Sequence, residues 1–80
     1  NHGLLTCGRT IPEAFMWLWT LQRACDVQIT AASAGPLRKL DAEVFEQAVR
    51  ESGPGESAVS EAVFASLVRA IDAKDPGYRQ

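Results

Sequence analysis

The stretch from residue 11 to residue 33 most constrains what this chain of 80 residues can fold into. It contains no glycine, and its single proline, Pro12, falls in a first helical turn, where the missing N–H costs no hydrogen bond. A helix of about 23 residues would be about 34 Å long. A compact domain of this size has a radius of gyration near 12 Å, so one helix would cross the whole body.

Both ends of this helix carry boundary signals. Thr10 and Glu13 have the spacing of a capping box, in which Thr10 binds the N–H of Glu13 and Glu13 reaches back to the N–H of Thr10. Gly35 and the proline after it end the helix. The sequence therefore predicts a long helix over 10–34.

The predicted helix is apolar on nearly all sides. Trp17 and Trp19 lie about 200° apart around its axis, which indicates packing in a core or interface rather than one stacking platform. Its apolar residues are Ile11, Ala14, Phe15, Met16, Trp17, Leu18, Trp19, Leu21, Ala24, Cys25, Val27, Ile29, Ala31 and Ala32. Such a helix must be covered on more than one side. We expect a sheet, a neighbouring subunit or both to cover it.

The rest of the chain predicts one strand and two further helices. An apolar run between glycines favours a short buried strand within 1–8. Asp41 can cap a helix over 41–52. A third helix is expected over 57–73, followed by a tail over 74–80. From these residues alone we expect a helical piece of a larger α/β assembly, with an independent helical binding domain as the alternative.

Composition excludes several classes of protein. Eight Lys and Arg against ten Asp and Glu give a net charge of −2, so no basic excess is present for phosphate contacts and nucleic acid is not expected as a partner. The longest apolar run, 14–19, is far shorter than the roughly 20 residues of a membrane-spanning helix. No targeting segment is visible, and we expect a cytoplasmic protein.

His2 is the only histidine of the chain. A metal site needs three or four ligands, and no second His, Cys or carboxylate lies at ligand spacing. Taken alone, His2 is therefore interpreted as a structural or terminal side chain. No nucleophile with its base and no glycine-rich phosphate loop is present either.

Several segments of the chain form a recognisable pattern. The first is Asn1-His2-Gly3 with the apolar run and glycine that follow, up to residue 10. Glu13-Ala14-Phe15 then opens the long helix, and 21–28 is close to L-E-R-A-C-x-x-Q. Together these segments resemble the class II aldolase/adducin family. The resemblance covers roughly 1–35, and the segments 67–72 and 75–78 also look like the tail of many bacterial members.

The resemblance implies an α/β fold. Such proteins are three-layer α/β/α domains with a central, mainly antiparallel sheet, and most are homotetramers. Residues 1–80 would be the mostly helical C-terminal portion of a single domain. Most of the active site would then lie upstream of Asn1, in the remainder of the same domain, and this segment alone is not expected to be active.

The resemblance also implies a metal site. Family members hold a divalent metal, most commonly Zn²⁺, with Fe²⁺ or Mn²⁺ as alternatives, through an H-x-H pair and the histidine of the N-H-G turn. His2 would be that third ligand, and residues 1–8 would form the strand and the metal-ligand turn that carries it. Tyr78 is the candidate for a C-terminal tyrosine that reaches a neighbouring subunit's active site.

The function implied is that of a divalent-metal-dependent lyase. It would cleave or form a C–C bond next to a carbonyl through a metal-stabilised enediolate, on a sugar phosphate or related hydroxy-carbonyl compound. Two alternatives within the family stay open. One is a metal-dependent decarboxylase or iron oxygenase relative, and the other is a non-catalytic, adducin-like structural or interaction module.

Overall fold

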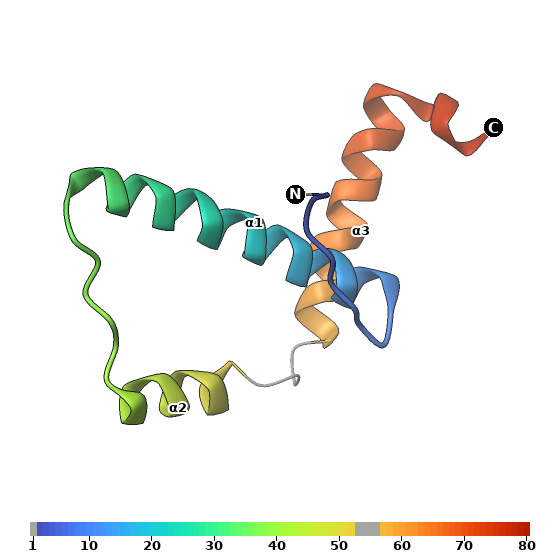
Figure 1. The fold of residues 1–80 in the computed structure, drawn as a ribbon. Coiled ribbons are helices and arrows are strands. Elements are labelled where there is room, and N and C mark those ends of the chain that lie inside the picture. Colours follow the sequence, from blue (N-terminus) through green and yellow to red (C-terminus); the bar gives the residue numbers. More distant parts are fainter. Residues whose placement is uncertain (1, 53–56) are drawn as a thin grey trace.

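The computed structural model describes residues 2–52 and 57–80, and Asn1 of the N-H-G motif lies outside them. This part of the chain forms three α-helices and one short 3₁₀ helix (Figure 1). They are α1 (Ile11–Ala34), α2 (Ala42–Glu51), α3 (Ser57–Lys74) and η1 (Pro76–Arg79). The three α-helices lie where the sequence predicts helices, and η1 lies within the predicted tail.

The start of α1 keeps half of the predicted capping box. The Thr10 hydroxyl accepts the Glu13 N–H at 3.3 Å, and Pro12 occupies the first turn. The prediction for the return contact was wrong: the Glu13 carboxylate accepts the N–H of Arg9, at 3.0 Å, rather than that of Thr10. The chain before Thr10 folds back over the first turn and brings the Arg9 N–H within reach. At the other end Gly35 has φ +153°, a conformation that favours glycine and ends the helix.

The strand predicted within residues 1–8 is not formed. Residues 2–8 carry no regular secondary structure, and the described residues contain no strand with which they could pair. A strand needs a partner for its backbone N–H and C=O groups, so an apolar run alone does not make one. Instead, this segment lies against the start of α1.

Helices α1 and α3 cross and contact each other (Figure 1). The rings of Phe15 and Phe64 meet edge to face, with centroids 5.5 Å apart and an interplanar angle of 66°. Ser60, one turn before Phe64, is 8% exposed and is the only buried residue in the described part of the chain. This crossing packs α3 against the N-terminal half of α1, which the segment that carries His2 precedes.

Helix α2 lies apart from the other helices and contacts neither α1 nor α3 among the described residues (Figure 1). Its apolar residues Val44, Phe45 and Val49 are all exposed. Asp41 occupies the N-cap position as predicted, but its side chain makes no hydrogen bond to the first turn. The backbone C=O of Asp41 instead accepts the N–H of Phe45 at 3.0 Å, the first hydrogen bond of the helix.

The described residues do not enclose a hydrophobic core. No apolar residue in the described part of the chain is buried. The radius of gyration is 16.2 Å, against about 12 Å for a compact domain of this length. The accessible surface is 7078 Å², against about 4,700 Å² for a compact protein of this mass. These 80 residues therefore need further contacts to complete a core.

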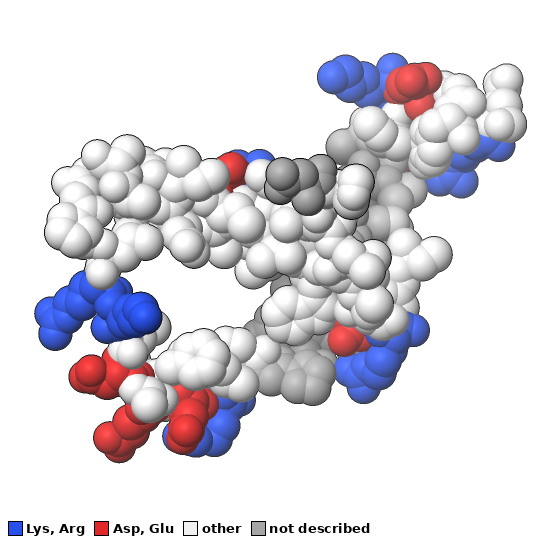
Figure 2. All heavy atoms as spheres, in the orientation of Figure 1, with Lys and Arg blue, Asp and Glu red and all other residues white. Residues whose placement is uncertain are grey.

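The two tryptophans illustrate this exposure. Trp17 is 41% exposed and Trp19 is 51% exposed, so both are only partly covered within this chain. In Figure 2 charged side chains gather around α2 and at the far end of α3, while the visible surface of α1 is largely uncharged. Of the helices that the structure describes, none combines the length and apolar character needed to cross a membrane.

Candidate functional site

His2 lies on the segment that precedes α1, and its side chain is exposed. The next residue, Gly3, has φ +112°, and a Cβ placed there would have no atom within 4 Å. Glycine is thus required by the backbone conformation and not by lack of space. The His2 side chain beside it is accessible to solvent.

Three residues that follow His2 in the chain, Thr6, Gly8 and Arg9, contact the first turn of α1. The Thr6 hydroxyl donates to the backbone C=O of Ala14 at 2.9 Å. The Glu13 carboxylate accepts the Arg9 N–H at 3.0 Å and Arg9 Nε at 3.3 Å. At Gly8 the two backbones touch directly, because a Cβ there would lie 2.5 Å from the backbone nitrogen of Ala14. Residues 6–9 are therefore held on two consecutive residues of the helix.

The described residues could supply only part of the ligand set of a metal ion. They contain no group of three or more His, Cys, Asp or Glu side chains that could hold an ion. A neutral imidazole is a good zinc ligand, and the exposed side chain of His2 can supply one. The other ligands would have to come from outside the described part of this chain.

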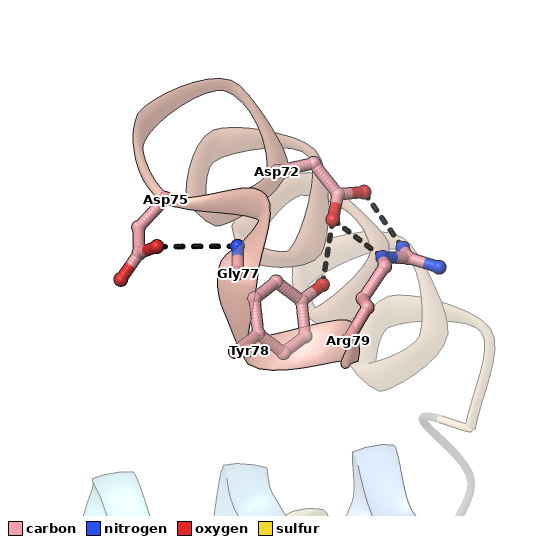
Figure 3. A network of polar contacts seen from close by, with 5 residues as sticks. All are labelled: Asp72, Asp75, Gly77, Tyr78 and Arg79. Atoms are coloured by element: carbon pink, nitrogen blue, oxygen red, sulfur yellow. Dashed lines mark hydrogen bonds and ion pairs between the residues drawn. The ribbon is translucent and has the colours of Figure 1, made fainter.

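Tyr78 belongs to a polar cluster at the end of α3 (Figure 3). Its hydroxyl donates to Asp72 Oδ1 at 2.7 Å. Arg79 donates to both oxygens of the same carboxylate, from Nε and Nη2, each at 2.7 Å. The Arg79 guanidinium also lies 5.5 Å from the centre of the Tyr78 ring. The Tyr78 hydroxyl is thus engaged by a carboxylate of its own chain.

The hydrogen bonds of this cluster shift the titration of its members. Those from Arg79, and next from Tyr78, lower the pKa of Asp72 below its ordinary value. The same bond to Asp72 raises the pKa of Tyr78 and keeps the phenol protonated. The hydrogen bond with Asp72 also raises the pKa of Arg79. The cluster therefore holds a carboxylate anion between two donors.

The structure does not bring together His2 and Tyr78, the two candidate site residues predicted from the sequence. His2 precedes α1 and Tyr78 lies on η1 beyond α3, and no hydrogen bond in the described part of the chain connects them.

The sequence did not single out an open groove beside the N-terminal segment. The groove has a volume of about 460 Å³ and is lined by Gly3, Leu4, Phe15, Leu18, Trp19 and Gln22. Four of these residues have the spacing of one helical face, a signal that could have revealed it. Arg23 lies 5.6 Å from the centre of the Trp19 ring at its border. The groove places an apolar wall next to the segment that carries His2.

Comparison with known proteins finds a family match for the segment around His2. Residues 1–29 match the family model of the class II aldolase and adducin N-terminal domain. The chain belongs to the class II aldolase and adducin family. The match includes the N-H-G motif, the residues 6–9 that contact α1 and most of α1 itself, and it ends before α2.

Individual relatives extend the similarity to different degrees. A Pseudomonas aeruginosa protein named provisionally as an aldolase class 2 protein is 39% identical over 87 residues, covering 100% of this chain and 33% of that protein. Gamma-adducin of Mus musculus is 33% identical over 94 residues, covering 99% of this chain and 13% of its own length. Decarboxylase NovR of Streptomyces niveus is 40% identical over 53 residues, covering 66% of this chain and 20% of its own length.

This chain spans about a third of the length of the Pseudomonas relative and less of the other two. No solved structure matches it.

Proposed function

We propose that this chain is part of a divalent-metal-dependent lyase of the class II aldolase type, which makes or breaks a C–C bond next to a carbonyl. The observation that carries the proposal is the exposed His2 at the start of a segment that matches the family. Full coverage of the chain by the Pseudomonas relative, against 66% by the decarboxylase, favours an aldolase over a decarboxylase or oxygenase.

In this proposal His2 supplies one metal ligand. A neutral imidazole would offer one ring nitrogen to the metal, while the other donates its N–H to an acceptor that fixes the ring. The metal is most commonly zinc in the family, with Fe²⁺ or Mn²⁺ as alternatives, and when bound it would polarise a substrate carbonyl as a Lewis acid. The remaining ligands and the catalytic acid or base would lie outside residues 1–80. The substrate would be a sugar phosphate or a related hydroxy-carbonyl compound.

The proposal also accounts for the missing core. The accessible surface exceeds that of a compact chain by about 2,300 Å², which is in the range of large obligate interfaces. We propose that the remainder of a three-layer α/β/α domain covers the apolar surface of α1 and α3. Neighbouring copies in a homotetramer would cover the rest.

The second candidate function is a non-catalytic interaction module of the adducin type. The match to gamma-adducin over 99% of the chain favours it, as do the exposed apolar side chains. This candidate needs no bound metal, so metal content separates the two.

The test uses the full-length protein with this chain in place. We would purify the wild type and His2→Ala and measure bound metal by elemental mass spectrometry. Lys39→Ala, an exposed change in the connector beyond the segment that matches the family model, is the control. We expect about one metal ion per wild-type and control subunit, and at least a tenfold lower content in His2→Ala.

Two outcomes would contradict the lyase. Metal content in His2→Ala equal to that of the wild type would remove His2 from the ligand set. A metal-free wild type that fails to cleave hydroxy-carbonyl phosphates after zinc is added would favour the adducin-type module.

A further inference from the structure

We propose that Glu13 is a positioning residue, which fixes the segment 6–9 on the first turn of α1 and thereby sets where His2 lies. The inference depends on the proposed function in one respect only, that His2 binds the metal. The inference is based on one contact. The largely buried carboxylate of Glu13, at the start of α1, accepts a hydrogen bond from the backbone of the segment that precedes this helix.

The Glu13 side chain is only 13% exposed. A carboxylate withdrawn from water to this degree needs hydrogen-bond partners, and Glu13 has them in Arg9, through the backbone N–H at 3.0 Å and through Nε at 3.3 Å. The bond to the N–H restrains the main chain itself and not only a flexible side chain. The negative charge in the first turn is also favourable with respect to the helix dipole.

The position of this bond separates it from ordinary helix capping. In a capping box the acid binds the N–H of the cap residue, which here is Thr10. Glu13 instead binds Arg9, which lies outside the helix in the segment that leads to His2. The Glu13 N–H itself is bound by Thr10, so a single residue both helps to start α1 and holds the segment before it.

Two neighbouring contacts make this attachment rigid. Thr6 donates to the backbone C=O of Ala14 at 2.9 Å, one residue after Glu13. Gly8 leaves no space between the segment and the helix, because its Cβ would lie 2.5 Å from the Ala14 nitrogen. The segment is thus bound at its two ends and pressed against the helix between them.

His2 is near enough to depend on this attachment. It lies four residues before Thr6, which an extended chain covers in about 13 Å. Ligand geometry must be held to within about 0.5 Å for a site to work. Loosening residues 6–9 would therefore displace the imidazole and weaken metal binding while leaving the ligand itself in place.

The experiment measures zinc affinity of the full-length protein by competition with a chromophoric chelator, using zinc alone as the probe. We would compare the wild type with Glu13→Ala, Glu13→Gln and Thr6→Val. We expect zinc to bind at least tenfold more weakly in Glu13→Ala, the size of effect seen when groups that orient a ligand are lost. Glu13→Gln retains an oxygen that can accept the Arg9 N–H, so we expect it to restore affinity to within about threefold of wild type.

Two matched controls are available in the same chain. Glu46→Ala removes the acid from an i, i+4 pair with Arg50, at 4.0 Å on α2. Thr30→Val removes a hydroxyl that donates to the C=O of Asp26 at 2.9 Å, further along α1. We expect neither control to change zinc affinity, because neither residue contacts the segment before α1.

Amide hydrogen exchange at Arg9 gives a readout that does not depend on metal. We expect faster exchange of this N–H in Glu13→Ala and near-normal exchange in Glu13→Gln. Unchanged exchange in Glu13→Ala would overturn the proposed attachment. If Glu13→Ala does not fold, reduced zinc affinity in Thr6→Val supports the inference and unchanged affinity contradicts it.

The outcomes also separate this inference from the proposed function. Normal zinc binding in Glu13→Ala together with lost binding in His2→Ala would overturn the positioning role and leave the metal site standing. Normal zinc binding in His2→Ala would overturn the metal site and, with it, the effect of Glu13 on zinc.

Discussion

Asp72 and Arg79, seven residues apart, form a bidentate ion pair in which both hydrogen bonds measure 2.7 Å. The pair folds η1 back onto the last turn of α3 (Figure 3). Asp75 helps to make the turn between them, since its carboxylate accepts the Gly77 N–H at 3.2 Å. The C-terminal residues are therefore organised by one carboxylate of the preceding helix.

Replacing Asp72 should release η1. We expect Asp72→Ala to accelerate amide exchange over residues 77–80, because the variant loses the bonds from Tyr78 and Arg79 together. Asp26→Ala is a suitable control, since Asp26 pairs with Arg23 at 3.9 Å on the exposed surface of α1. Equal exchange of residues 77–80 in Asp72→Ala and the wild type would contradict this prediction.

The hydrogen bonds of the same cluster should be lost at both low and high pH. The pKa of Asp72 is lowered from 3.8, chiefly by its bond to Arg79, so the contact is intact above that value and is lost as pH falls through the lowered pKa. The pKa of Tyr78 is raised from 10.0 by its bond to Asp72, so its contact is intact below pH 10 and is lost as pH rises through the raised pKa. NMR titration of the Asp72 carboxyl carbon and of the Tyr78 ring would check both limits. An Asp72 that titrates at or above 3.8 would contradict the first.

Gly8→Ala should destabilise the chain through a direct clash. Its Cβ would meet backbone atoms of the helix, which cannot move aside as a side chain can. We expect a loss of about 1–3 kcal/mol in the free energy of unfolding, measured by urea denaturation of the full-length protein. Gly3→Ala provides the contrast: it meets no atom, and its cost comes from the positive φ alone. A Gly8→Ala variant as stable as the wild type would show that the segment can leave the helix freely.

The contact between Phe15 and Phe64 should account for coupling between α1 and α3. A double-mutant cycle with alanine at both positions is expected to give about 0.5–1.5 kcal/mol of coupling, the range for aromatic pairs of this geometry. The matched cycle pairs Phe15 with Phe45 of α2, where we expect none, because α2 contacts neither helix. Similar coupling in the two cycles would be incompatible with the arrangement described.

The sequence predicted the helices well because their signals are local. Thr10 and Pro12 mark the start of α1, and Gly35 marks its end, within a few residues of the atoms they act on. The strand predicted within residues 1–8 is absent from the described part of the chain for the opposite reason. Its formation depends on a partner strand, which no local pattern can reveal.

The candidate site was only partly predictable for a similar reason. The N-H-G motif indicated His2, but the attachment of its segment to Glu13 departs from the capping pattern by one residue. Tyr78 was singled out for its position near the C-terminus. Its bond to Asp72 spans six residues and depends on a turn that brings the chain back, so helical spacing alone could not predict it.

The isolation of α2 has a consequence for how this segment can vary. The alignment with gamma-adducin spans 94 positions, more than the 80 residues of this chain, so the adducin carries additional residues somewhere along it. Because α2 touches neither α1 nor α3, lengthening the connector 35–41 would leave the Phe15–Phe64 contact undisturbed. We therefore expect the Phe15–Phe64 contact to persist when a spacer or an epitope is inserted into that connector.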